Sequence, residues 1–148
     1  MVDNLTPAQR RKNMQAIKSK SKLEEIVSKE LWKRGIRYRR NVKTLKGKPD
    51  IAIKKYKVVV FIDSCFWHGC PIHGNIPKTN RDYWVNKITR NKERDESVNA
   101  YYLENSWNVM RVWEHEIKED LNEVVDRIES FVLAAKETIH STKESSIK

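Results

Sequence analysis

The chain of 148 residues has few of the residues on which disulfide-rich and membrane-spanning proteins depend. It contains two cysteines, four glycines and four prolines, and no apolar run approaches the roughly 18 residues that a membrane helix needs. Two cysteines exclude a disulfide framework, and residues 1–14 lack the apolar segment of a signal peptide. We therefore expect one cytoplasmic domain that does not contact a membrane.

Acidic residues are scarce in the first part of the chain. Residues 1–57 carry 18 Lys and Arg against 5 Asp and Glu, a net charge of +13, whereas the remainder carries 12 against 15. Hydrophobic residues make up 39% of the chain, which is enough for a core. The basic excess indicates a polyanionic partner, and nucleic acid is favoured over a membrane surface because no segment is amphipathic and apolar enough to anchor.

Hydrophobic periodicity predicts a mixed α/β domain. Helices are expected over residues 7–17, 21–34, 82–105 and 121–135. Strands are expected over residues 36–42, 50–53, 58–62 and 107–113, the third of them buried on both faces. Thr6 has the pattern of an N-cap, as does Asp82, and Gly35 that of a helix end. The order predicts a mixed sheet with helices on its faces, with residues 1–140 as a single domain and residues 141–148 as a flexible tail.

Two carboxylates lie where predicted neighbouring strands begin or end. Asp50 follows a proline at the start of one strand, and Asp63 ends the next. Carboxylate oxygens suit Mg²⁺, so one interpretation is a metal site for phosphodiester hydrolysis, with Glu24 orienting a metal-bound water. The alternative is that Asp50 and Asp63 are ordinary turn and strand-end residues, and that Glu24 complements a helix dipole.

Five groups of residues stand out between about residue 10 and residue 118. They are Asn13-Met14-Gln15-Ala16-Ile17, Gly47-Lys48-Pro49-Asp50-Ile51, Cys65-Phe66-Trp67-His68-Gly69-Cys70-Pro71, Tyr83-Trp84 with Asn91-Lys92-Glu93-Arg94-Asp95, and Trp107-Asn108-Val109-Met110-Arg111-Val112-Trp113-Glu114. In this order they resemble the very short patch repair endonucleases, mismatch-nicking members of the restriction-endonuclease-like superfamily. The third group is highly specific, whereas a lone Pro-Asp pair is weak. The resemblance implies the α/β restriction-endonuclease-like fold, a mixed sheet flanked by helices, with a loop stapled by zinc.

The resemblance also implies a set of catalytic residues. Asp50 is the principal Mg²⁺ ligand and the backbone carbonyl of Ile62 a second, while Glu24 rather than Glu25 matches the helix-borne acid. His68 is the catalytic histidine, a general base or phosphate-side acid. Asp63 is a second metal ligand or a helper on the phosphate side. Cys65 occupies the place, two residues after Asp63, where the wider superfamily has a lysine.

A second metal, structural zinc, is implied for the loop over residues 64–81. Cys70 and His73 have ligand spacing, and the resemblance assigns Asp95 and His115 as the remaining ligands of a closed tetrahedral site. Cys65 is expected to be a packed thiol rather than a ligand. The alternative is a buried Cys70 thiol and a solvated His73.

Basic and aromatic residues are expected to contact DNA. Cations of the helical arm over residues 7–17 follow phosphates, namely Arg10, Arg11 and Lys12. By the resemblance, apolar side chains enter the base stack beside a mismatch, namely Met14, Phe66, Trp67 and Trp84. Lys87 and Asn91 share a helix face with Trp84 and read base edges near it. The alternative is that the four apolar side chains belong to the core.

The resemblance therefore predicts a Mg²⁺-dependent endonuclease that nicks one strand of double-stranded DNA at a T:G mismatch and leaves 5′-phosphate and 3′-hydroxyl ends. It implies repair of deaminated 5-methylcytosine by a monomer in a bacterial nucleoid, with mismatch-repair proteins as further partners. One alternative is a restriction or mobile-element nuclease of the same fold. Another is a catalytically inactive, zinc-stabilised DNA-binding protein.

Overall fold

The computed structural model describes residues 6–70 and 76–147, without the side chains of residues 12, 13, 15–20 and 140–147. Its elements are α1 (Pro7–Lys33), β1 (Arg39–Arg40), β2 (Ile51–Ile53), the 3₁₀ turn η1 (Lys54–Tyr56), β3 (Val58–Asp63), α2 (Arg81–Glu104), β4 (Asn108–Trp113), α3 (Glu114–Glu119) and α4 (Leu121–Ile147). Within the described residues, no helix combines the length and apolarity needed to cross a bilayer.

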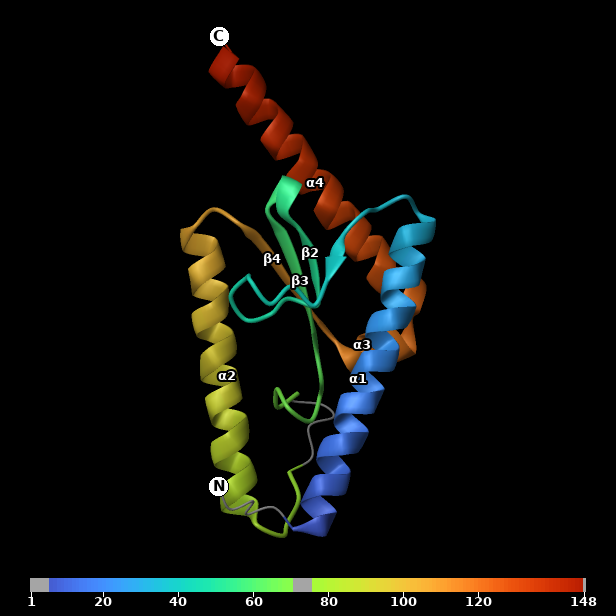
Figure 1. Ribbon diagram of the computed structural model, residues 1–148, viewed down its shortest axis with the longest axis vertical. Coiled ribbons are helices and arrows are strands. Elements are labelled where there is room, and N and C mark those ends of the chain that lie inside the picture. The colour runs from blue at the N-terminus through green and yellow to red at the C-terminus, as the bar shows by residue number, and fades with distance from the viewer. Residues whose placement is uncertain (1–5, 71–75, 148) are drawn as a thin grey trace.

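A four-stranded mixed sheet in the order β1-β2-β3-β4 forms the centre of the fold. β1, β2 and β3 pair antiparallel, and β3 pairs parallel with β4. Alternate side chains of β3 enter two cores: Val60 packs with α1 and α4, and Phe61 packs with α2. Helices therefore cover both faces of the sheet (Figure 1), and β3 is buried along its whole length, as its apolar sequence predicts.

α1 is one helix of 27 residues where the sequence predicts two. Its start is the expected capping box, in which Thr6 and Gln9 exchange hydrogen bonds between side chain and backbone. No Gly or Pro lies between residues 17 and 21, so nothing breaks the helix there. It ends as predicted at Gly35, whose φ is 85° and whose neighbour Ile36 donates its N–H to the carbonyl of Leu31.

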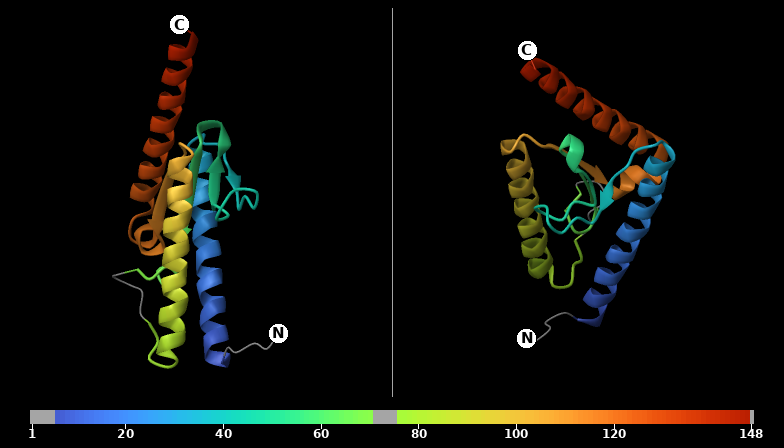
Figure 2. Two further views of the ribbon diagram at one scale, coloured as in Figure 1. Left: turned by 90° about the vertical axis from the view of Figure 1, so that its left-hand side faces the viewer. Right: turned by 45° about the horizontal axis from the view of Figure 1, so that its top comes forward.

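Other boundaries differ from the sequence prediction. The strand expected over residues 36–42 shrinks to the two residues of β1. The N-cap of α2 is Asn80, in the left-handed region, and Asp82 lies inside the first turn. α4 continues to Ile147 and extends away from the sheet (Figure 2), so the segment expected to be a tail is helical, because no Gly or Pro interrupts it after Ala135.

The parallel pairing of β3 and β4 brings their carboxyl ends to the same edge of the sheet. Asp63 ends β3 there, and Trp113 at the end of β4 leads directly into α3. α1 and α2 both extend past this edge (Figure 1), with the loop that follows Asp63 between them. The ends of α1 and α2, the loop after Asp63 and the start of α3 therefore lie at this end of the molecule.

Candidate active site and metal centre

The loop Ser64–Cys70 is held by hydrogen bonds from within and from two helices. His68 donates its N–H to the carbonyl of Ser64 at 3.0 Å. The side chain of Glu114, at the start of α3, accepts the N–H of Cys65 at 3.1 Å. Asn91 of α2 donates to the carbonyl of Trp67 at 2.9 Å. The loop therefore has a defined position relative to both helices.

Gly69 allows the loop to lie directly against α2. Its φ of 65° favours glycine, and a Cβ at this position would lie 2.4 Å from Cε of Lys92 and 2.7 Å from Cγ2 of Ile88. The close approach places the preceding residue, His68, against the middle of α2.

His68 is the centre of a charged cluster formed with Asp63, Asp95 and Arg111. Its Nδ1 lies 2.5 Å from Oδ2 of Asp95 and 3.7 Å from Oδ1 of Asp63. Nη1 of Arg111 lies 2.9 Å from Asp63 and 3.5 Å from Asp95. Because an imidazole with Nδ1 donating to a carboxylate accepts protons at Nε2, the cluster suits His68 to general-base chemistry.

Asp63 is an unusual acid because it is almost fully buried, with 5% of its surface exposed. Burial raises the pKa of Asp63, although the charges of His68 and Arg111 act in the opposite direction. The pair with Arg111 thus offsets part of the desolvation cost of the carboxylate.

Asp50 lies one strand away, where β2 begins. Its Oδ2 accepts the N–H of Ile62 at 2.6 Å, so the carboxylate lies beside the Ile62 peptide. Asp50 and the Ile62 carbonyl offer the hard oxygen donors that Mg²⁺ prefers. Glu24 of α1 is buried, whereas Glu25 is exposed and pairs with Lys29 at 3.2 Å.

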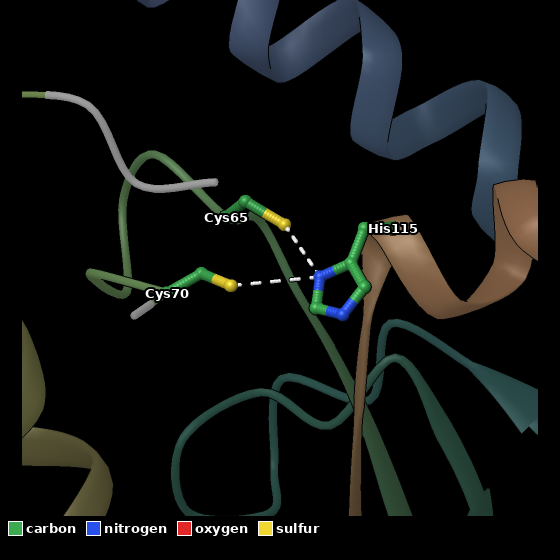
Figure 3. A group of neighbouring side chains, drawn as sticks. All are labelled: Cys65, Cys70 and His115. Atoms are coloured by element: carbon green, nitrogen blue, oxygen red, sulfur yellow. Dashed lines mark hydrogen bonds between the residues drawn. The ribbon is translucent and has the colours of Figure 1, made fainter. Parts of the chain in front are cut away.

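Cys65, Cys70 and His115 form a second cluster, in which Sγ and imidazole atoms all lie within 4.8 Å of one another. Figure 3 shows both thiols directed at Nδ1 of His115, at 3.3 Å from Cys65 and 3.5 Å from Cys70. Burial raises the pKa of the Cys65 thiol to about 11, so a metal that binds there must displace its proton. Two thiols and an imidazole are soft donors that suit zinc.

This cluster differs from the ligand set expected from the sequence. Cys70 and His115 lie together as expected, and His73 is outside the described residues. Asp95 is not a member, because its side chain on α2 contacts His68 and Arg111 instead. Cys65, expected to be only a packed thiol, takes the third place.

Comparison with known proteins adds evidence that is independent of this geometry. The family model described as "DNA mismatch endonuclease Vsr" matches residues 2–73. The DNA mismatch endonuclease Vsr of Escherichia coli K12 is 34% identical over 117 residues, which cover 77% of this chain and 74% of that protein. This chain belongs to the Vsr family. The type II nicking enzyme V.HpaIIP of Haemophilus parainfluenzae is 44% identical over 116 residues, covering 76% and 82% of the two chains, and V.NaeI of Lentzea aerocolonigenes is 47% identical over 119 residues, covering 76% and 72%.

The Vsr-family chain is therefore a DNA endonuclease. The residues expected to contact DNA differ in their exposure. Met14 is 55% exposed, and Arg10 and Arg11 are exposed as well, while the Lys12 side chain lies outside the described set. Trp84, in contrast, is 1% exposed, so it is a core residue rather than a side chain that enters DNA.

Trp84 supports the two aromatic residues that remain accessible. Its ring centroid lies 5.1 Å from that of Phe66 and 6.0 Å from that of Trp67, both half-buried. Nζ of Lys87 lies 5.9 Å from the Trp67 ring, and Asn91 is engaged with the Trp67 carbonyl. In this Vsr-family site, α2 thus positions Phe66 and Trp67.

Sequence reasoning missed Arg111 and Glu114 as site residues. Arg111 is the one charged residue of β4 and lies within the fifth group that carries the family resemblance, and these two facts were the available signal. In the β4 register Arg111 lies opposite Phe61, two residues before Asp63. Glu114 follows the strand directly, and nothing in its local sequence indicates that it binds the backbone of a loop 49 residues earlier.

Proposed function

We propose that this Vsr-family endonuclease nicks one strand of double-stranded DNA at a T:G mismatch and leaves 5′-phosphate and 3′-hydroxyl ends, as in the repair of deaminated 5-methylcytosine. The observation that carries the proposal is the position of Phe66 and Trp67, which directly precede His68 on one fixed loop. Aromatic side chains that enter a base stack favour sites that are easily unstacked, and a T:G wobble pair is such a site. Phe66 and Trp67, proposed to recognise the mismatch, and His68, proposed to act in hydrolysis, are therefore consecutive in the chain.

In this proposal His68 takes the proton of the attacking water. Asp95 accepts from Nδ1 and holds the ring, so that Nε2 is the basic nitrogen. Arg111 holds Asp63 and Asp95 in place behind the ring. Contact with Arg111 and His68 supports Asp63 as a helper on the phosphate side rather than as a second metal ligand.

The donor set at Asp50 fits Mg²⁺, with the Asp50 carboxylate and the Ile62 carbonyl as the proposed ligands. When bound there, Mg²⁺ polarises the phosphate and lowers the pKa of a coordinated water. Glu24, buried on α1, is proposed to orient that water.

The thiol cluster is proposed to hold structural zinc. Cys70 and His115 keep the roles expected from the sequence, and Cys65 replaces Asp95. His73, which lies outside the described residues, is proposed as the fourth ligand, as the family resemblance implies. A closed site of this kind joins the loop that carries His68 to the start of α3, and it adds binding energy directly to folding.

DNA contacts are proposed for Met14, Phe66 and Trp67 at the base stack, and for Lys87 and Asn91 beside Trp67. Arg10, Arg11 and Lys12 are proposed to follow phosphates. The enzyme is proposed to act as a monomer on nucleoid DNA in the cytoplasm, with mismatch-repair proteins as partners.

A nicking assay with a panel of mismatched and matched duplexes tests this function. Wild type should nick the T:G duplex far faster than the matched duplex. In Trp67→Ala the rate of nicking at the mismatch should fall by one to two orders of magnitude, since base–aromatic stacking contributes about 1–3 kcal/mol. Trp32→Ala is the matched control, because Trp32 is an exposed tryptophan of α1 outside the described site. A Trp67→Ala enzyme that keeps the mismatched-to-matched ratio would refute the role of Trp67.

The names of the relatives favour a second candidate. V.HpaIIP and V.NaeI are both called type II nicking enzymes, and both share more identity with this chain than the E. coli Vsr does. The alternative is therefore a nickase that serves a type II restriction system, with a flanking target sequence matched to that system. Nicking of one mismatch across varied flanking sequences separates the candidates, because a restriction-linked enzyme should be selective for a single flanking context.

A further inference from the structure

The geometry points to a phosphate-binding site of the nicked strand, formed by Lys48 and Arg94 at a cavity beside His68. This inference rests on the DNA endonuclease activity of the family and is independent of the proposed metals and of the mismatch preference. The cavity encloses about 190 Å³ and is lined by residues of the loop before β2, the end of β3, α2 and β4. The charged and titratable side chains of its lining are Lys48, Asp63, His68, Arg94, Asp95 and Arg111.

The inner wall of the cavity carries two carboxylates, one guanidinium and one imidazole. Asp63 and Asp95 face Arg111 and His68 at distances between 2.5 and 3.7 Å. With His68 neutral, as its proposed role as a base requires, Arg111 is the one cation among these four side chains, so the two carboxylates leave this wall with a net charge of −1.

The remaining two charged side chains of the lining are both cations. Lys48 and Arg94 are exposed, and among the described residues neither forms an ion pair. One comes from the loop before β2 and the other from α2, so they approach the cavity from different elements. An anion at the opening would therefore meet two cations that form no ion pair with another described residue. A guanidinium and an ammonium are the usual phosphate donors of proteins.

The backbone holds Lys48 in this position. Gly47 and Lys48 both have positive φ, 77° and 50°, and the second is uncommon for a residue with a side chain. A Cβ on Gly47 would lie 2.9 Å from Val98, so the loop packs directly on α2. Tyr102 fixes it further by donating its hydroxyl to the carbonyl of Lys46 at 2.5 Å.

The ligand is a phosphodiester of DNA rather than a free metabolite because of the neighbours of the cavity. His68 lines it, and Lys48 lies two residues before Asp50 in the chain. A backbone phosphate held there is close to the proposed hydrolytic centre. Lys48 and Arg94 would then fix the register of the nicked strand, since phosphate contacts position the DNA without reading its sequence.

The test uses the intact chain and four alanine variants. Lys48→Ala and Arg94→Ala remove the proposed contacts. Lys43→Ala and Arg90→Ala are matched controls, because each removes the same charge from an exposed position of the same loop or helix without lining the cavity. Binding is measured without added divalent cation on a set of duplexes in which single phosphates are replaced by uncharged methylphosphonates. Failure of the metal assignments therefore leaves this readout unchanged.

We expect one particular phosphate of the nicked strand to matter for wild type. Its replacement by a methylphosphonate should weaken DNA binding by about tenfold, as for the loss of one charge-assisted hydrogen bond. Lys48→Ala and Arg94→Ala should bind unmodified DNA about tenfold more weakly, show little further loss at that phosphate, and have a salt slope lower by about 1. The controls, Lys43→Ala and Arg90→Ala, should lose as much affinity as wild type when that phosphate is replaced by a methylphosphonate. The inference is wrong if no phosphate couples to Lys48 or Arg94, or if the controls couple to the same phosphate. Lys48→Gln and Arg94→Gln repeat the test should an alanine variant unfold.

Discussion

Replacement of Arg111 by leucine should destabilise the protein and disable the cluster around His68. Arg111 donates to Asp63 at 2.9 Å and to Asn99 at 2.7 Å, and its guanidinium lies 4.3 Å from the centroid of Phe61. Leucine keeps the apolar stem of the side chain but supplies no donor. The buried carboxylate of Asp63 would then face Asp95 without the cation that separates them.

The magnitude follows from how deeply the pair is buried. The side chains of Arg111 and Asp63 are 18% and 7% exposed. Removal of one partner of a buried ion pair costs about 3–5 kcal/mol, and the partial exposure of Arg111 places the expected loss at about 3 kcal/mol. At about 2–4 °C per kcal/mol for a chain of this size, the melting temperature should fall by about 6–12 °C. A domain stability of about 5–15 kcal/mol leaves the variant folded at 25 °C.

Urea unfolding at several pH values tests this reasoning. Burial already raises the pKa of Asp63, and loss of Arg111 should raise it further. The folded variant then takes up a proton at higher pH than the unfolded chain, so its deficit relative to wild type should shrink as pH falls through that pKa. Arg34→Leu is the control, because its partner Asp126 has a side chain that is 65% exposed and such surface pairs contribute about 1 kcal/mol or less. A deficit equal to that of Arg34→Leu at pH 7, or one that does not change with pH, would refute the reasoning.

Four further predictions concern the site and its supports. Asp50→Ala should abolish nicking while DNA affinity, measured by titration, stays the same or rises, because a negative charge near phosphate is lost; substantial residual turnover would contradict this. His68→Ala should slow single-turnover nicking by about 10²–10⁴ with an unchanged melting temperature, and an unfolded variant would contradict it. Cys70→Ser should lower zinc content from one per chain and reduce the melting temperature, and an active zinc-free wild type would argue against the site. Tyr102→Phe should lower the free energy of unfolding by about 1–3 kcal/mol at pH 8, because it leaves the Lys46 carbonyl without its donor. Burial raises the pKa of Tyr102 from 10.0 to about 12, so the greater stability of wild type should be complete below pH 10 and fade as pH rises from about 10 to about 12, whereas Tyr101→Phe at an exposed position should show neither effect.

Local patterns predicted the elements whose sequence determines their structure without distant partners. The apolar run of β3 is buried along its length, and the capping box at Thr6 and the left-handed Gly35 lie where expected. The division of α1 into two helices was wrong, because a polar segment without Gly or Pro does not end a helix that is packed elsewhere along its length. Periodicity reports which face is apolar, but not how far a helix continues.

The site was harder to predict because its members come together only in the tertiary structure. The resemblance assigned Asp95 to the zinc site, but in the structure its carboxylate contacts His68, because spacing along the sequence does not fix which cluster a helix face meets. Trp84 and Trp67 are both tryptophans in groups that carry the family resemblance, so the sequence does not distinguish them. In the structure Trp84 is buried and Trp67 half-buried, because the loop that carries Trp67 packs on α2 over Trp84. Arg111 depends on the parallel register of β3 and β4, which no short segment of sequence contains.

The continuity of α1 has a geometric consequence for how this enzyme would engage its substrate. Met14 and Glu24 are ten residues apart on one uninterrupted helix, so their axial separation is about 15 Å and their angular relation is fixed by the helical repeat. Insertion of a single alanine between them would turn Met14 by about 100° about the helix axis and move it by about 1.5 Å. The spacing between Met14, proposed to contact the base stack, and Glu24, proposed to orient a metal-bound water, is therefore set by the α-helix itself and not by a flexible connection between them.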